Sequence, residues 1–129
     1  GHIINVGSVA GLMPGGPYMA TYYATKSYVV SLTNALAEEL KRLGSHAQVH
    51  ALCPGPVNTE FNDVANVKFS LKGISARECV SYCIDEADKG KIIIVPNMMV
   101  KAAVIASKFV PREIVLGIVA RSQKSKIER

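Results

Sequence analysis

Two short apolar runs that each end in turn residues most strongly constrain what this chain can fold into. The first run, His2–Val6, is typical of a buried strand and ends in the small residues 7–11. The second run, residues 49–52, leads into a turn rich in proline and glycine at residues 53–56. In open α/β sheets, ligands bind outside the carboxyl ends of the strands. We therefore expect the residues after these two runs to form a binding site.

The segment between the two runs predicts one long helix over residues 17–43. Pro17 suits the first turn of a helix because its φ is fixed, and Gly44 is suited to end it. The loop before the helix, residues 11–17, holds three glycines and two prolines. Apolar side chains recur along the helix at three- and four-residue steps and form a stripe, at Val29, Leu32, Leu36 and Leu40.

The first turns of this helix carry Tyr22 and Lys26, four residues apart and so on one helical face. A free phenol has a pKa near ~10, and a nearby cation lowers the pKa of a phenol toward the range useful for acid–base catalysis. Most pairs at this spacing are solvated surface residues, so the pair gains weight from Ser8, fourteen residues upstream. Tyr23 has Ser27 rather than a cation four residues on, and we expect it to be a packing aromatic.

Three segments in order and register resemble the carboxyl-terminal half of the short-chain dehydrogenases/reductases. They are IINVGSVAG at residues 3–11, Pro17 with YYATK after four intervening residues, at residues 22–26, and VHALCPGPVNT at residues 49–59. The resemblance covers residues 1 to about 60. It implies an α/β fold with the last three strands, and their flanking helices, of a Rossmann-like doubly wound parallel sheet. Residues 1–95 would form the second half of an NAD(P)-binding domain, and residues 96–129 a helical extension.

The resemblance also implies an oxidoreductase that reduces a carbonyl or oxidises a secondary alcohol with NAD or NADP. Tyr22 would donate the proton in reduction and accept it in oxidation, and Lys26 would favour its phenolate and bind the nicotinamide ribose. Ser8 would polarise the substrate oxygen. The cofactor-binding positions implied in this way are Tyr22, Lys26, Pro54, Gly55, Val57 and Thr59.

The sequence departs from the family by lacking a glycine-rich dinucleotide fingerprint and the family's catalytic asparagine. We therefore expect a half-domain that is inactive when isolated, with His2–Val6 as an apolar edge that pairs with another chain or with a missing half. By resemblance, the helix over residues 17–43 would form a homo-oligomer interface. One alternative is a non-catalytic fold fragment or oligomerisation module, and another is a membrane-surface reductase of long-chain lipid ketones.

The formal charge of +5 lies in the last 29 residues, which hold seven basic and two acidic residues, whereas residues 1–100 are balanced. This pattern is typical of a solvated tail, and no aromatic interleaving or recognition motif indicates nucleic-acid binding. Residues 97–110 and a segment that restarts at Pro111 predict two helices packed on the domain or on a partner subunit. A membrane surface is the less favoured alternative for them.

The three cysteines and the lack of a visible signal peptide fit a reducing cytosol, so we expect a cytoplasmic protein. Cys79 and Cys83 stand four residues apart without a third ligand nearby, and we expect core residues rather than a metal site.

The helix that carries these cysteines should begin at a capping box on Ser75 and end at Gly90, before a last strand over residues 91–95. Residues 58–73 occupy the place of a substrate lid, and their apolar side chains indicate an apolar carbonyl or alcohol substrate.

Overall fold

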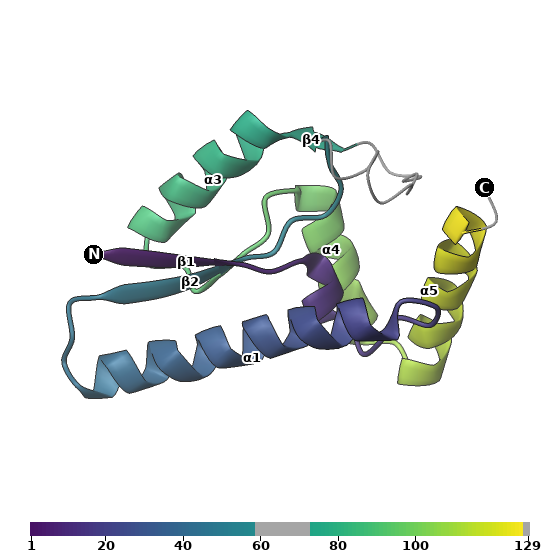
Figure 1. The fold of residues 1–129 in the computed structure, drawn as a ribbon, viewed down its shortest axis with the longest axis horizontal. Coiled ribbons are helices and arrows are strands. Elements are labelled where there is room, and N and C mark those ends of the chain that lie inside the picture. Colours follow the sequence, from purple (N-terminus) through teal and green to yellow (C-terminus); the bar gives the residue numbers. More distant parts are fainter. Residues whose placement is uncertain (59–72, 128–129) are drawn as a thin grey trace.

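The centre of the molecule is a parallel sheet of three strands in the order β1-β2-β5. The computed structural model describes residues 1–58 and 73–127, so Thr59 and all of the predicted lid except its end residues 58 and 73 lie outside the described residues. β1 spans His2–Val6, β2 spans Gln48–Leu52 and β5 spans Ile93–Ile94. Helix α1 (Ala20–Arg42) runs along one side of the strands and α3 (Ala76–Asp88) along the other (Figure 1). The predicted α/β class with flanking helices is confirmed.

The alternation of side chains along β2 builds a separate core on each face of the sheet. Ala51 and Cys53 pack on the α1 side against Val30 of α1. Leu52 points the other way and packs, with Ile94 of β5, against α3. The α3 residues in that core are Cys79, Cys83 and Ala87. Both cysteines are buried, which confirms the prediction that they are core residues.

Helix α1 begins later than predicted, at Ala20 instead of Pro17. The reason is Tyr18, which has a φ of 68° and so lies in the left-handed region that an α-helix cannot include. The other end agrees with the prediction, because Gly44 has a φ of 66° and stops the helix two residues after Arg42.

The capping box predicted at Ser75 is present, with reciprocal hydrogen bonds between Ser75 and Glu78. The strand predicted over residues 91–95 is wrong in length, since β5 holds two residues. The backbone N–H of Lys91 donates to the carbonyl of Glu86 and closes the end of α3, so Lys91 is not free to extend the strand. Pro96, just beyond Val95, has no N–H to give to a ladder.

Strand β1 forms one edge of the sheet, because β2 is its ladder partner among the described residues. Ile3 and Val6 are exposed on this edge. A second, two-stranded parallel sheet joins β3 (Val57–Asn58) to β4 (Ile74–Ser75).

Two helices follow β5: α4 (Met98–Ser107), which is capped by the side chain of Asn97, and α5 (Arg112–Ile127). α5 stands beside the amino-terminal end of α1, far from the chain's amino terminus (Figure 1). Across the described residues, none of the helices combines the length and the apolarity that a membrane crossing requires.

Candidate active site

The carboxyl ends of β1 and β2 are tied to each other by backbone hydrogen bonds. Gly7 N donates to the carbonyl of Leu52 at 2.7 Å, and Val9 N donates to the carbonyl of Pro54 at 3.1 Å. The two turns predicted to form a site are therefore neighbours at one end of the sheet.

Ser8 caps the short 3₁₀ helix η1 (Val9–Leu12) that leaves β1. Its Oγ accepts a hydrogen bond from Ala10 N at 3.1 Å, and the residue is 8% exposed. A serine hydroxyl has one proton to donate and two lone pairs to accept with. The cap uses a lone pair, so the hydroxyl proton remains for a ligand oxygen.

Tyr22 and Lys26 lie in the first two turns of α1, as predicted, and both are partly exposed. The Nζ of Lys26 is 5.7 Å from the centre of the Tyr22 ring. The same Nζ donates to the carbonyl of Val6 at 3.4 Å. This contact places the ammonium at the end of β1, where Val6 precedes Ser8 by two residues. An ammonium has three N–H donors, so two remain after the contact with Val6.

Gly11 allows η1 to approach the backbone of α1 at this point. A Cβ on Gly11 would lie 2.4 Å from the carbonyl oxygen of Lys26 and 2.9 Å from a methyl carbon of Val30. The hydroxyl of Ser27 donates to the carbonyl of Gly11 at 3.4 Å. The position of Lys26 relative to Ser8 therefore depends on a residue without a side chain at position 11.

Cys53 follows β2 and lies beneath the site. A Cβ on Gly7 would be 3.3 Å from its Sγ. Burial raises the pKa of the Cys53 thiol from 9.0 to about 11, and a hydrogen bond from the Ser8 backbone and the charge of Lys26 offset part of that effect. Because the thiolate is the reactive form, Cys53 is a structural residue at neutral pH.

Tyr23 is buried, as predicted for a packing aromatic, but it also makes a polar contact that the sequence did not indicate. Gln123 of α5 donates a hydrogen bond from Nε2 to the Tyr23 hydroxyl at 2.7 Å. Burial raises the pKa of Tyr23, and the bond from Gln123 offsets part of that rise. Ala10, Tyr23, Val115 and Val119 form a small core, and Tyr22 packs against it.

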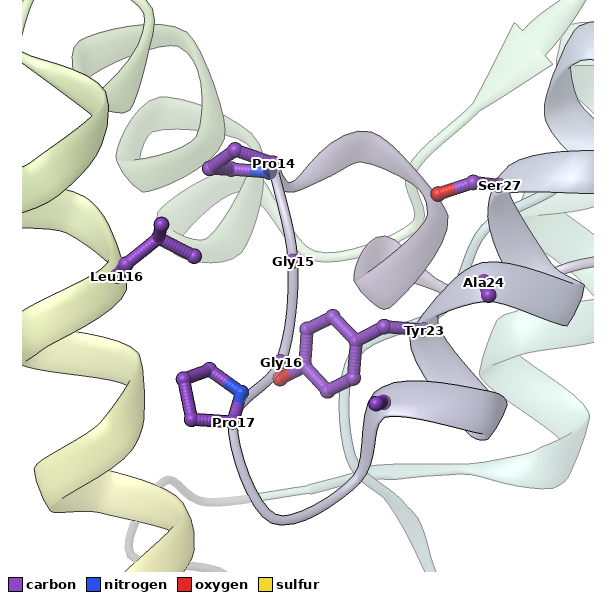
Figure 2. A pocket seen from close by; sticks show the side chains of 9 residues that line it. Pro14, Gly15, Gly16, Pro17, Tyr23, Ala24, Ser27 and Leu116 are labelled. Atoms are coloured by element: carbon purple, nitrogen blue, oxygen red, sulfur yellow. The ribbon is translucent and has the colours of Figure 1, made fainter.

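A cavity of about 270 Å³ lies beside Tyr23, between the loop before α1 and helix α5. Figure 2 shows the ring of Tyr23 next to Gly16, with Leu116 reaching toward the loop from α5. A Cβ on Gly16 would be 2.0 Å from the Tyr23 ring. Gly16 thus leaves room for the Tyr23 ring at the start of α1. The residues that line the cavity are mainly small or apolar.

Three of the positions expected to contact a cofactor, Pro54, Gly55 and Val57, lie in or directly after the turn that follows β2. The carbonyl of Pro54 accepts from Val9, and the backbone of Gly55 lies against α4, where an added Cβ would be 3.0 Å from a methyl carbon of Val100. Val57 begins β3.

A family model described as short chain dehydrogenase matches residues 1–68. An uncharacterized oxidoreductase of Staphylococcus saprophyticus is 31% identical over 105 residues, which cover 71% of this chain and 42% of that protein. A short-chain dehydrogenase from Sphingobium yanoikuyae, solved in complex with NADPH, has a TM-score of 0.68 and 30% sequence identity; the match covers 84% of this chain and 42% of that one. A short-chain dehydrogenase/reductase from Burkholderia phymatum, solved in complex with NAD, has a TM-score of 0.68 and 25% sequence identity; the match covers 81% of this chain and 45% of that one. The chain thus spans less than half the length of each of these proteins.

Proposed function

The chain belongs to the short-chain dehydrogenase family, and on that premise we propose that it carries the acid–base site of an oxidoreductase dependent on NAD or NADP. The reaction is the reduction of a carbonyl to a secondary alcohol, or its reverse. The observation that carries the proposal is the ammonium of Lys26, 5.7 Å from the Tyr22 ring and within 3.4 Å of the Val6 carbonyl, at the end of the strand that leads into Ser8.

Tyr22 and Ser8 act on the same substrate oxygen in this proposal. During reduction, negative charge develops on the carbonyl oxygen, and pre-placed donors stabilise it. Ser8 donates its free hydroxyl proton to that oxygen, because its cap to Ala10 already occupies a lone pair. Tyr22 then transfers its phenolic proton to the oxygen, and the Lys26 cation stabilises the phenolate left behind. In oxidation the proton moves in the opposite direction.

The residues present fit a nicotinamide cofactor at the turn after β2. Lys26 keeps donors for ribose hydroxyls. Gly55 lets the turn after β2 pack closely against Val100 of α4, which holds this turn in place. The other positions proposed for contact with the cofactor are Pro54, Gly55, Val57 and Thr59. When bound, the cofactor supplies or accepts the hydride.

The proposed substrate is a small carbonyl or alcohol compound with an apolar body. The support for an apolar body is the set of apolar side chains in the sequence of residues 58–73. The cavity beside Tyr23 is a separate feature, because Ser8, Tyr22 and Lys26 are not on its wall. The proposal includes a homo-oligomer with α1 at its interface, supported by exposed Tyr28, Leu32 and Leu36 on that helix. It also includes a cytoplasmic location and no nucleic-acid partner.

The second candidate is a non-catalytic fold module that keeps the helix interface without the chemistry. The exposed apolar edge at β1 favours it, since an edge of this kind pairs with other chains. The two candidates differ in cofactor-dependent turnover by the complete polypeptide that carries this sequence. Turnover supports the enzyme, whereas its absence with NADH and with NADPH supports the module.

Substitution of Lys26 tests the proposed contact with the cofactor. In the complete polypeptide, Lys26→Met should weaken binding of NADH or NADPH by roughly tenfold to a hundredfold, the value of a charge-assisted hydrogen bond. Fluorescence titration measures this affinity, and Lys41→Met, on the exposed end of the same helix, is the matched control. Equal affinities for wild type and Lys26→Met would remove the proposed role of Lys26.

A further inference from the structure

Helix α4 is apolar on its outer face as well as on its inner face. Val100 and Val104 are buried in the core shared with α1 and β2. The opposite side of α4 is exposed, with Met99 at 78%, and Phe109 just beyond the helix is 87% exposed. A helix that is apolar all round is normally buried on all sides. This outer face consists of Met98, Met99, Ala102, Ala103, Ile105, Ala106, Phe109 and Val110.

The charged side chains within and directly after α4, over residues 97–112, are all basic, although the carboxylate of Glu86 on α3 lies within electrostatic range of Lys101. The segment over residues 97–112 contains Lys101, Lys108 and Arg112 and no aspartate or glutamate. Lys101 and Lys108 are seven residues apart and therefore lie along one side of the helix, between its buried and exposed faces. Long basic side chains can lay their stems along apolar surface while the charged groups stay in water.

Two other occupants fit the outer face less well. A segment that extended the sheet would pair with the free edge of β1, whereas α4 follows β5 at the opposite edge. A second copy of the chain would bring the same patch against itself, as twofold interfaces do. That arrangement would place Lys108 near its own symmetry mate, and residues 97–112 hold no carboxylate to pair with it, whereas Lys101 has the charge of Glu86 nearby.

We propose that the outer face of α4 docks on the surface of an anionic lipid membrane. The apolar side chains enter the boundary between headgroups and acyl chains, and the basic side chains at its margin meet the lipid phosphates. Phe109 is placed to enter first, because it is the most exposed apolar side chain of the set. The helix lies on the membrane and does not cross it, in keeping with the length and composition of α4. This inference does not depend on the proposed enzymatic activity.

Co-sedimentation of the complete polypeptide with lipid vesicles tests the proposal. Vesicles of phosphatidylcholine with phosphatidylglycerol should bind the protein, and high salt should weaken the binding. The double variant Lys101→Gln/Lys108→Gln should bind about fivefold more weakly for each lysine replaced. Phe109→Ser should reduce binding by about tenfold or more, the effect expected for loss of one large apolar anchor.

Matched controls lie at the far end of α1. Leu43→Ser replaces a residue that is 80% exposed, and Lys41→Gln removes an exposed lysine, so neither should change vesicle binding. Recovery of the wild-type protein in the supernatant at low salt would overturn the proposal. So would equal binding by wild type and Phe109→Ser. A dimer in analytical ultracentrifugation that Phe109→Ser dissociates, without vesicle binding by either protein, would assign the face to a second copy instead.

Discussion

The side-chain amide of Gln123 donates a hydrogen bond of 2.7 Å to the phenolic oxygen of Tyr23, the residue next to Tyr22. The two partners are 100 positions apart in the chain, and both are buried. The bond fastens α5 to the first turns of α1, where Val115 and Val119 add apolar contacts around Tyr23. The last helix is therefore part of the support for the residue proposed to transfer the proton.

The Gln123–Tyr23 bond should appear as an energetic coupling between the two side chains. Tyr23→Phe leaves the Gln123 amide buried without its partner and should lower the free energy of unfolding by about 1–3 kcal/mol. Adding Gln123→Met to Tyr23→Phe removes the buried amide that has lost its partner. The double variant should therefore lose less unfolding free energy than the two single variants lose in sum, by about 1 kcal/mol. Urea unfolding of the four proteins measures this coupling. Additive losses would show that the bond contributes nothing.

Replacement of Gly11 should move or loosen the start of α1. Gly11→Ala would bring a Cβ to 2.4 Å from the Lys26 carbonyl oxygen, and neither backbone can yield without shifting the other. We expect a loss of about 1–3 kcal/mol in unfolding free energy, the cost of overpacking, together with weaker cofactor binding. Gly117→Ala is the control, because an added Cβ in α5 would have no neighbour within 4 Å. It should be neutral or stabilising by up to about 1 kcal/mol, and equal effects of the two substitutions would contradict this interpretation.

Stability should fall between pH 9 and pH 11 because of Cys53. Burial raises the pKa of this thiol from 9.0 to about 11 in the folded state. Below pH 9 both states hold the proton and the full stability is present. As the pH rises, the unfolded chain loses its proton first, so unfolding becomes easier by roughly 3 kcal/mol until the folded thiol also ionises. Urea unfolding at several pH values should show a shallower decline for Cys53→Ala, and an identical decline would exclude this cause.

Local chemistry in the sequence predicts much of the fold. The small residues after His2–Val6, the capping box at Ser75 and the left-handed Gly44 each act through their near neighbours, and each is found as predicted. Helical spacing predicts that Tyr22 and Lys26 share one face of α1, whereas the hydrogen bond of the Lys26 ammonium to the Val6 carbonyl is a contact between distant segments.

The features that the sequence did not predict are of two kinds. The first is the left-handed φ of Tyr18, which delays the start of α1 and which a tyrosine side chain does not favour. The second kind depends on contacts between distant segments. The partnership of Gln123 with Tyr23 exists because α5 folds back onto α1, and no periodicity indicates it. The exposure of the outer face of α4 also depends on how distant segments pack. The sequence shows that α4 is apolar, but not which of its sides other segments cover.

The rate of NADH- or NADPH-dependent ketone reduction by Tyr22→Phe tests the central claim most directly. The assay uses the complete polypeptide, a series of ketones of increasing chain length, and Tyr23→Phe as the control on the adjacent residue. The account predicts that Tyr22→Phe lowers turnover by about 10²–10⁴-fold, the contribution of a positioned acid–base group, with unchanged cofactor affinity, while Tyr23→Phe keeps most of the activity. Turnover by Tyr22→Phe at the wild-type rate would contradict the account.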